Sequence, residues 1–132
     1  YRHWGTDLAR RLNGMFAFAI IDKIRGRLYL ARDRFGEKPL FYTAKSDLFA
    51  FSSELKSLEK HSGIDGNISN FGLQKLFAYG YIPAPNSLLE NVFKLPAGQQ
   101  MTVELDTLDT KISKYWEFLI TPDDNLTAAK DD

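Results

Sequence analysis

Apolar residues occupy every position of one stretch near the start of the chain. Residues 15 to 21 read Met-Phe-Ala-Phe-Ala-Ile-Ile, with no polar residue among them. A strand without polar alternation is typical of a sheet that is covered on both faces. We therefore expect residues 15 to 21 to form a central strand. A short helix should precede it, because Leu8 and Leu12 fall at helical spacing after Asp7, and Asn13 begins a stop signal.

Three antiparallel hairpins are predicted from extended segments separated by turn residues. The first joins the apolar strand to residues 27 to 31 through a turn in which Gly26 allows a positive φ. The second spans residues 40 to 52, and the last pairs residues 100 to 104 with residues 112 to 116. Most of the β-structure should therefore arise from segments that are neighbours in the sequence.

Two further helices complete the pattern. Residues 54 to 60 should form a short packing helix with Ser52 or Ser53 as its cap. Residues 69 to 79 carry the clearest helical pattern of the chain, with a serine or asparagine cap at the start and Gly80 at the end. The apolar face of this second helix comprises Phe71, Leu73, Leu76 and Phe77.

The composition fits one globular domain and excludes several classes of protein. Of the 132 residues 44% are hydrophobic, and 17 basic residues balance 17 acidic ones, so bulk charge gives no reason to expect nucleic acid as a partner. Cysteine is absent, which excludes disulfides, thiolate metal sites and cysteine nucleophiles within these residues and fits a cytoplasmic protein. No apolar run reaches the roughly 18 residues of a membrane span, and the start lacks a signal peptide. Because no initiator Met is present, we expect a fragment.

Few residues favour a catalytic or metal-binding interpretation. His3 and His61 have no partner at metal-ligand spacing, so no metal site is expected. The run from Arg32 to Arg34 could bind an anion, but the favoured interpretation is an ion-paired turn in which Asp33 accepts backbone hydrogen bonds. The ten phenylalanines follow strand and helix periodicity and are expected in the core.

The remaining motifs form one collinear set that spans about residues 4 to 116. They are LNGMFAFAI (12–20), LARDRFGEKPLFY (30–42), FSSELKSL (51–58), YGYIPAP (79–85), KLPAG (94–98) and YW (115–116). In this order and at this spacing they resemble the class II glutamine amidotransferase domain of glutamine-hydrolysing asparagine synthetases. The PAP and KLPAG segments favour that branch over related amidotransferases.

The resemblance implies an α+β fold of two stacked antiparallel sheets flanked by helices, as in N-terminal-nucleophile hydrolases. Residues 1 to 118 would be the C-terminal part of this domain, and residues 119 to 132 a linker or tail toward a synthetase domain. The family's cysteine nucleophile and glutamine-holding residues would lie upstream, so no catalytic residue is expected in this chain. ATP and Mg²⁺ would serve the synthetase domain, where ammonia from glutamine amidates activated aspartate, and this chain itself would hold no cofactor.

Only a few residues receive a role from the resemblance. Met15 matches a position in the wall of the ammonia passage between the two active centres, and the alternative is that Met15 only fills the core. A structural rather than catalytic motif is expected from Arg32, Asp33, Arg34, Gly36, Lys38 and Pro39.

Two alternatives remain open. The chain could be a non-catalytic interaction or regulatory module that kept the fold, or part of a sister class II amidotransferase with another acceptor. If half of a two-sheet sandwich is missing, an apolar face and an unpaired strand edge are exposed. We therefore expect the isolated chain to self-associate.

Overall fold

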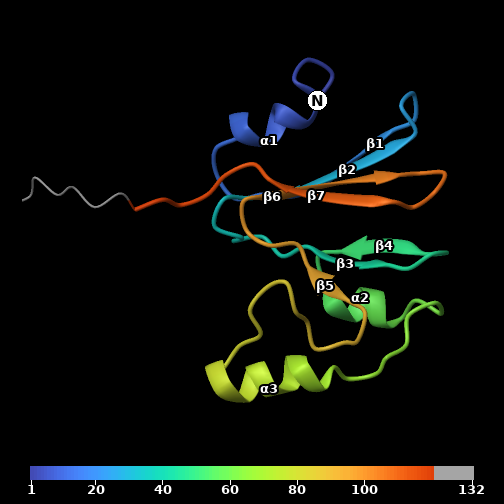
Figure 1. Cartoon of the computed structure of the whole chain (residues 1–132), viewed down its shortest axis with the longest axis vertical. Coiled ribbons are helices and arrows are strands. Elements are labelled where there is room, and N and C mark those ends of the chain that lie inside the picture. The colour runs from blue at the N-terminus through green and yellow to red at the C-terminus, as the bar shows by residue number, and fades with distance from the viewer. Residues whose placement is uncertain (121–132) are drawn as a thin grey trace, which may run out of the picture.

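Two stacked antiparallel sheets form the centre of the molecule, as the family resemblance implies (Figure 1). The computed structural model describes residues 1 to 120, so residues 121 to 132 of the predicted tail lie outside the described residues. The first sheet has the strand order β1-β2-β6-β7, and the second has the order β4-β3-β5. The strands are β1 (Ala17–Asp22), β2 (Arg27–Arg32), β3 (Phe41–Ala44), β4 (Phe49–Ser52), β5 (Phe93–Lys94), β6 (Gln99–Glu104) and β7 (Thr110–Lys114).

Helical segments lie on the outer sides of the two sheets (Figure 1). They are the 3-10 turn η1 (Gly5–Asp7), α1 (Leu8–Arg11), α2 (Leu55–Glu59) and α3 (Asn70–Tyr79). Among residues 1 to 120, no helix has both the length and the apolar character needed to cross a membrane. The α+β class with two antiparallel sheets and flanking helices is confirmed.

All three predicted hairpins are present. β1 pairs with β2 through a turn in which Gly26 has a φ of 63°. β3 pairs with β4, and β6 pairs with β7. The first sheet becomes continuous because β2 also pairs with β6, which brings Leu30 opposite Met101. This long-range pairing joins the first and last hairpins into one sheet.

Three apolar clusters hold the layers together. The cluster between the two sheets includes Leu30, Tyr42 and Met101. A second cluster lies on the outer face of the first sheet, where Ala9 of α1 packs with Tyr29. The third cluster lies on the outer face of the second sheet and includes Leu58 of α2, Ile64, Leu89 and Val92. Each sheet is therefore covered on both faces.

The expectation of a central β1 is wrong, because among the described residues β1 pairs only with β2 and forms an edge of its sheet. Its two faces are covered as predicted. Ala17 and Ala19 pack against the cluster between the sheets, and Phe18 and Ile20 pack against the outer cluster. A continuously apolar strand requires two covered faces, but its composition does not determine whether both edges are paired.

The predicted cap of α2 is also wrong. The residue that precedes this helix is Glu54, and no side chain caps the helix there. The hydroxyl of Ser52 instead accepts a hydrogen bond from the Glu54 amide at 3.1 Å, one residue before the helix begins. Ser52 therefore stabilises a local turn and does not accept a hydrogen bond from any backbone N–H in the first turn of α2.

The limits of α3 agree with the prediction, but the expected position of its phenylalanines does not. Ser69 accepts a hydrogen bond from the Gly72 amide, and Gly80 ends the helix with a φ of 76°. Phe71 is 58% exposed and Phe77 is 82% exposed, whereas the one buried residue of α3 is Gly72. Six of the ten phenylalanines are exposed, so the prediction that the phenylalanines lie in the core fails for most of them.

Candidate functional site

The carboxylate of Asp33 lies at the centre of the loop that follows β2. It is 1% exposed and accepts four backbone hydrogen bonds, from the amides of Phe16 (3.3 Å), Phe35 (3.1 Å), Glu37 (3.0 Å) and Lys38 (3.0 Å). Burial alone would raise the pKa of Asp33, but the backbone hydrogen bonds outweigh burial and lower it. The expected backbone hydrogen bonds are confirmed. The expected ion pair is not, since Asp33 forms none among residues 1 to 120.

Arg32 fixes the same loop from its other side. Its guanidinium donates to three backbone carbonyls, those of Gly36 (2.6 Å), Lys38 (2.7 Å) and Leu95 (2.7 Å). Burial lowers the pKa of Arg32, and the nearby Asp33 carboxylate opposes this shift. Three donors are therefore committed to the backbone, which leaves Arg32 poorly suited to hold a ligand.

Gly36 adopts a conformation that a side chain would disturb. Its φ is 68°, and a Cβ placed there would lie 3.1 Å from Cζ of Arg32 and 3.2 Å from Cβ of Ala97. A positive φ strains most other residues, and the close contacts leave little room for a methyl group. Glycine is required at this position by both the backbone angle and the space.

The loop is also joined to the last hairpin. The Gly98 amide donates to the carbonyl of Asp33 at 2.9 Å, and the Tyr115 hydroxyl donates to the carbonyl of Arg32 at 2.7 Å. Burial, with a smaller effect from the Asp33 charge, raises the pKa of Tyr115 to about 12. Sequence reasoning assigned no role to Gly98 or Tyr115, although both occur within the collinear motifs KLPAG and YW.

The other residues of the predicted structural motif contribute mainly through the backbone. Lys38 supplies an amide to Asp33 and a carbonyl to Arg32, while its side chain and Pro39 are exposed. Arg34 donates to the carbonyl of Arg10 at 3.4 Å, and its Nε is buried without a hydrogen-bond partner. The geometry of Arg32, Asp33, Gly36 and Lys38 is that of a structural loop.

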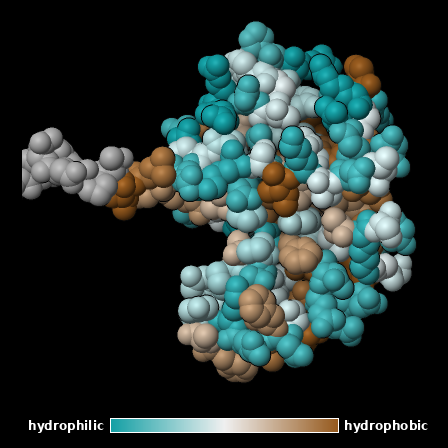
Figure 2. All heavy atoms as spheres, viewed as in Figure 1, coloured by the Kyte–Doolittle hydropathy of each residue, from teal (hydrophilic) through white to brown (hydrophobic). Residues whose placement is uncertain are grey.

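Two shallow hollows lie beside this loop and share Arg34 and Phe35. One has a volume of about 250 Å³ and is lined by Met15 and Asn13, among others. The other has a volume of about 380 Å³ and is lined by Trp116 and Phe118 among others. The Phe35 and Trp116 rings meet edge to face with centroids 5.1 Å apart. Figure 2 shows apolar side chains where the described chain ends, at the exposed residues 118 to 120.

Met15 does not fill the core. Its side chain is 64% exposed, and the neighbouring Phe35 is 66% exposed. The place of Met15 in the wall of the ammonia passage stays a prediction. We call Met15, Phe35, Trp116 and Phe118 the Phe35 strip, an apolar surface beside a rigid loop.

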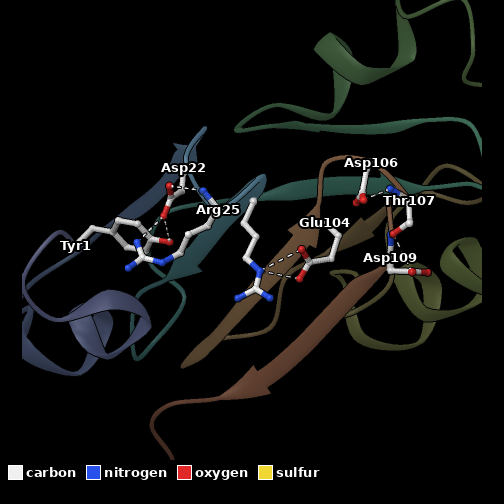
Figure 3. Close-up of polar contacts among 8 residues, drawn as sticks. Tyr1, Asp22, Arg25, Glu104, Asp106, Thr107 and Asp109 are labelled. Atoms are coloured by element: carbon white, nitrogen blue, oxygen red, sulfur yellow. Dashed lines mark hydrogen bonds and ion pairs between the residues drawn. The ribbon is translucent and has the colours of Figure 1, made fainter.

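A second buried carboxylate closes the β1–β2 turn at the opposite end of the first sheet (Figure 3). Asp22 accepts hydrogen bonds from the amides of Ile24 and Arg25, from the Tyr1 hydroxyl at 3.1 Å and from Nη1 of Arg25 at 2.9 Å. The hydrogen bond from the Arg25 side chain is the main cause that lowers the pKa of Asp22. These contacts also make Asp22 a structural residue.

The described residues offer little else for catalysis. His3 and His61 lie in separate parts of the sequence, and residues 1 to 120 contain no group of three or more His, Cys, Asp or Glu that could hold a metal ion. With no cysteine anywhere in the sequence, the chain has no thiol nucleophile.

The collinear motifs around this loop match a known family. The sequence profile described as a glutamine amidotransferase domain matches residues 1–116. The chain belongs to the glutamine amidotransferase domain family. The relatives of this amidotransferase domain include a protein of Methanocaldococcus jannaschii provisionally named glutamine-hydrolysing asparagine synthetase 2, which is 40% identical over 119 residues. That alignment covers 89% of this chain and 23% of the relative.

Glutamine-hydrolysing asparagine synthetases of Bacillus subtilis are further relatives of this amidotransferase domain. Asparagine synthetase 1 is 38% identical over 129 residues, which is 96% of this chain and 20% of the relative. Asparagine synthetase 3 is 35% identical over 117 residues, which is 88% of this chain and 19% of the relative. The chain therefore spans about a fifth of the length of the curated relatives it matches. The resemblance to the amidotransferase region of asparagine synthetases is confirmed.

Proposed function

We propose that this chain is the scaffold and interface portion of the glutaminase domain of a glutamine-hydrolysing asparagine synthetase, with both active centres outside the chain. The observation that carries the proposal is the family match over residues 1–116, combined with a loop in which the Arg32 guanidinium and the Asp33 carboxylate are bound by backbone groups. The oxygens of Asp33 and the guanidinium of Arg32 are occupied by backbone groups, so their role is to hold the loop.

In this proposal the parent protein divides the reaction between two domains. A cysteine nucleophile outside the chain releases ammonia from glutamine, and a synthetase domain uses that ammonia to amidate ATP-activated aspartate. ATP and Mg²⁺ belong to the synthetase domain. The chain alone is inactive, and the parent protein is cytoplasmic.

The Phe35 strip would face the rest of the parent protein. Met15 would form part of the wall of the ammonia passage, which its exposure beside a hollow of about 250 Å³ supports. Phe35 and Phe118 would pack against the synthetase domain. Exposed aromatic side chains on a rigid loop are typical of interaction surfaces.

A chimera tests the proposal. Residues 1 to 116 replace the matching segment of the Bacillus subtilis asparagine synthetase 1, whose own remaining segments supply the active centres. We expect the chimera to release ammonia from glutamine and the isolated 132-residue chain to release none. Turnover by the isolated chain would contradict the proposal, and so would a chimera that uses ammonia for asparagine synthesis but cannot hydrolyse glutamine.

A further inference from the structure

A hollow opens between the two sheets, beside the edge strands β5 and β7. Its volume is about 440 Å³, within the range of about 300 to 1,000 Å³ that is typical of small-molecule sites. Its lining comes from β3, β5, β6 and β7 and from the loops beside β5, and includes Tyr42, Phe93 and Ile112. We call this space the Tyr42 hollow.

The hydroxyl of Tyr42 is a polar group without a partner in this hollow. Tyr42 is only 8% exposed, and its ring packs against those of Phe49 and Phe93, with centroids 6.4 Å and 5.8 Å away. Among residues 1 to 120 the hydroxyl has no hydrogen-bond partner, yet it is not sealed in, since Nε of Arg34 is the one sealed side-chain atom without a partner there. Because Tyr42 lines the hollow, its hydroxyl opens onto it. A buried tyrosine hydroxyl usually has a partner, so this one offers a donor to a bound molecule.

The rest of the lining is apolar or uncharged. Phe93 and Ile112 form apolar walls, and the rings of Tyr42 and Phe93 are tilted by 38° relative to each other. Gln99 and Thr110 add uncharged polar side chains, and none of the described Asp, Glu, Lys or Arg residues lines the hollow. A charged ligand would lose its hydration there without gaining a counter-charge. The lining therefore favours an uncharged aromatic molecule.

The strand edges beside the Tyr42 hollow are completed or protected within this chain. The Lys94 amide of β5 donates to the carbonyl of Pro85 at 2.8 Å, so the segment before β5 already covers that edge. β7 carries Lys111 and Lys114, and lysine side chains are the usual protection of an edge that stays unpaired. β1, which has no lysine or proline, is the opposite edge of the first sheet. A further strand of the same domain would therefore add at β1 and leave the hollow open.

We propose that the Tyr42 hollow binds a small uncharged aromatic molecule that carries a hydrogen-bond acceptor. The ring lies against Phe93 and Ile112, and the acceptor takes the hydrogen bond that the Tyr42 hydroxyl donates. Burial raises the pKa of Tyr42, so the hydroxyl stays protonated and remains a donor at neutral pH. Binding is measured on the chain itself and is independent of the proposed function.

Two probes with the same aromatic ring test the proposal on the full 132-residue chain. Benzamide carries a carbonyl acceptor, and toluene carries none. We expect both probes to shift the NMR signals of Ala44, Phe93 and Ile112 in a saturable way, because these residues line the hollow. Tyr42→Phe removes only the hydroxyl, so it should weaken benzamide binding about tenfold and leave toluene binding unchanged. Tyr79→Phe, at the exposed end of α3, is the matched control and should change neither.

The stability of Tyr42→Phe gives a second readout. A hydroxyl without a protein partner adds no hydrogen bond to the fold, so the urea midpoint of the variant should equal or exceed that of the unchanged chain. A lower midpoint would show that the hydroxyl has a partner within the chain, which would overturn the proposal.

Three results with the probes would also overturn the proposal. The first is that neither probe gives saturable shifts of the lining residues. The second is that Tyr42→Phe weakens benzamide binding no more than toluene binding. The third is that benzamide binds the isolated chain but not the Bacillus subtilis chimera, although the chimera still makes asparagine from added ammonia and is therefore folded. That result would mean that another segment of the parent protein fills the hollow.

Discussion

The guanidinium of Arg32 occupies the space beside Gly36. Nη2 of Arg32 donates a hydrogen bond to the carbonyl of Gly36 at 2.6 Å, and the same guanidinium lies 3.1 Å from the position that a Gly36 side chain would take. Arg32 and Gly36 therefore depend on each other. The hydrogen bond from Arg32 stabilises the turn, and the absence of a side chain at Gly36 leaves space for the Arg32 guanidinium.

Substitution of Gly36 by alanine should lower the free energy of unfolding by about 2 to 4 kcal/mol, because strain at positive φ adds to displacement of Arg32. Gly26→Ala is the matched control. Gly26 has a similar φ of 63° but nothing within 4 Å of the added methyl group, so Gly26→Ala should lower the free energy of unfolding by only about 1 to 2 kcal/mol. Urea denaturation monitored by tryptophan fluorescence measures both values. Equal losses would show that the Arg32 contact does not matter.

Asp33→Asn should be strongly destabilising, by about 2 to 4 kcal/mol, because an amide nitrogen replaces one acceptor and faces buried backbone N–H groups. Asp47→Asn, in the exposed turn between β3 and β4, is the control and should change stability by less than about 0.5 kcal/mol. Urea melting again gives the difference. A change in the free energy of unfolding as small as that of Asp47→Asn would contradict the claim that the Asp33 carboxylate stabilises the loop.

Acid should unfold the protein partly through Asp33. Its pKa is lower in the folded state than the unfolded value of about 3.9, so the unfolded state binds more protons and stability rises with pH in this range. The contribution of Asp33 to the free energy of unfolding is complete above about pH 5, and it is lost as the pH falls through about 4 toward the pKa of Asp33 in the folded state. Asp22, whose pKa is also lowered, adds to the loss. Free energies of unfolding measured between pH 3 and pH 6 should vary less in Asp33→Asn, and an unchanged slope would contradict this account.

Local sequence signals predicted the hairpins and the limits of α3, because turn residues such as Gly26 and caps such as Ser69 act on their immediate neighbours. They did not predict what covers an apolar surface. Phe71 and Phe77 follow the pattern of a buried face and are exposed, and β1 has the composition of a central strand but lies at an edge.

The contacts of the Asp33 loop could be predicted only in part. Hydrogen bonds from Phe35 and Lys38 to Asp33 are local and were expected from the turn chemistry. The amides of Phe16 and Gly98 and the hydroxyl of Tyr115 reach the loop through strand pairing and come from distant positions. The pairing of β1 with β2 brings Phe16 to the loop, and the pairing of β2 with β6 brings Gly98 and Tyr115, so no short motif could identify them.

The chimera also tests the proposed role of Met15. Met15→Trp should narrow the ammonia passage, so asparagine formed per glutamine hydrolysed should fall several-fold while synthesis from added ammonia stays unchanged. Ile24→Trp enlarges another exposed side chain, in the β1–β2 turn at the opposite end of the first sheet, and should leave the ratio unchanged. Product analysis for asparagine and glutamate gives the ratio. An equal ratio of asparagine to glutamate in the two variants would contradict the proposal that Met15 lies in the wall of the passage.

The central claim is that this chain supplies the glutaminase scaffold of an asparagine synthetase. The most direct measurement is the amount of asparagine that the chimera forms from glutamine, ATP and aspartate, relative to the amount that it forms from added ammonia. The account predicts that glutamine supports synthesis at a rate comparable to that with ammonia. Synthesis from ammonia alone, with no product from glutamine, would contradict it.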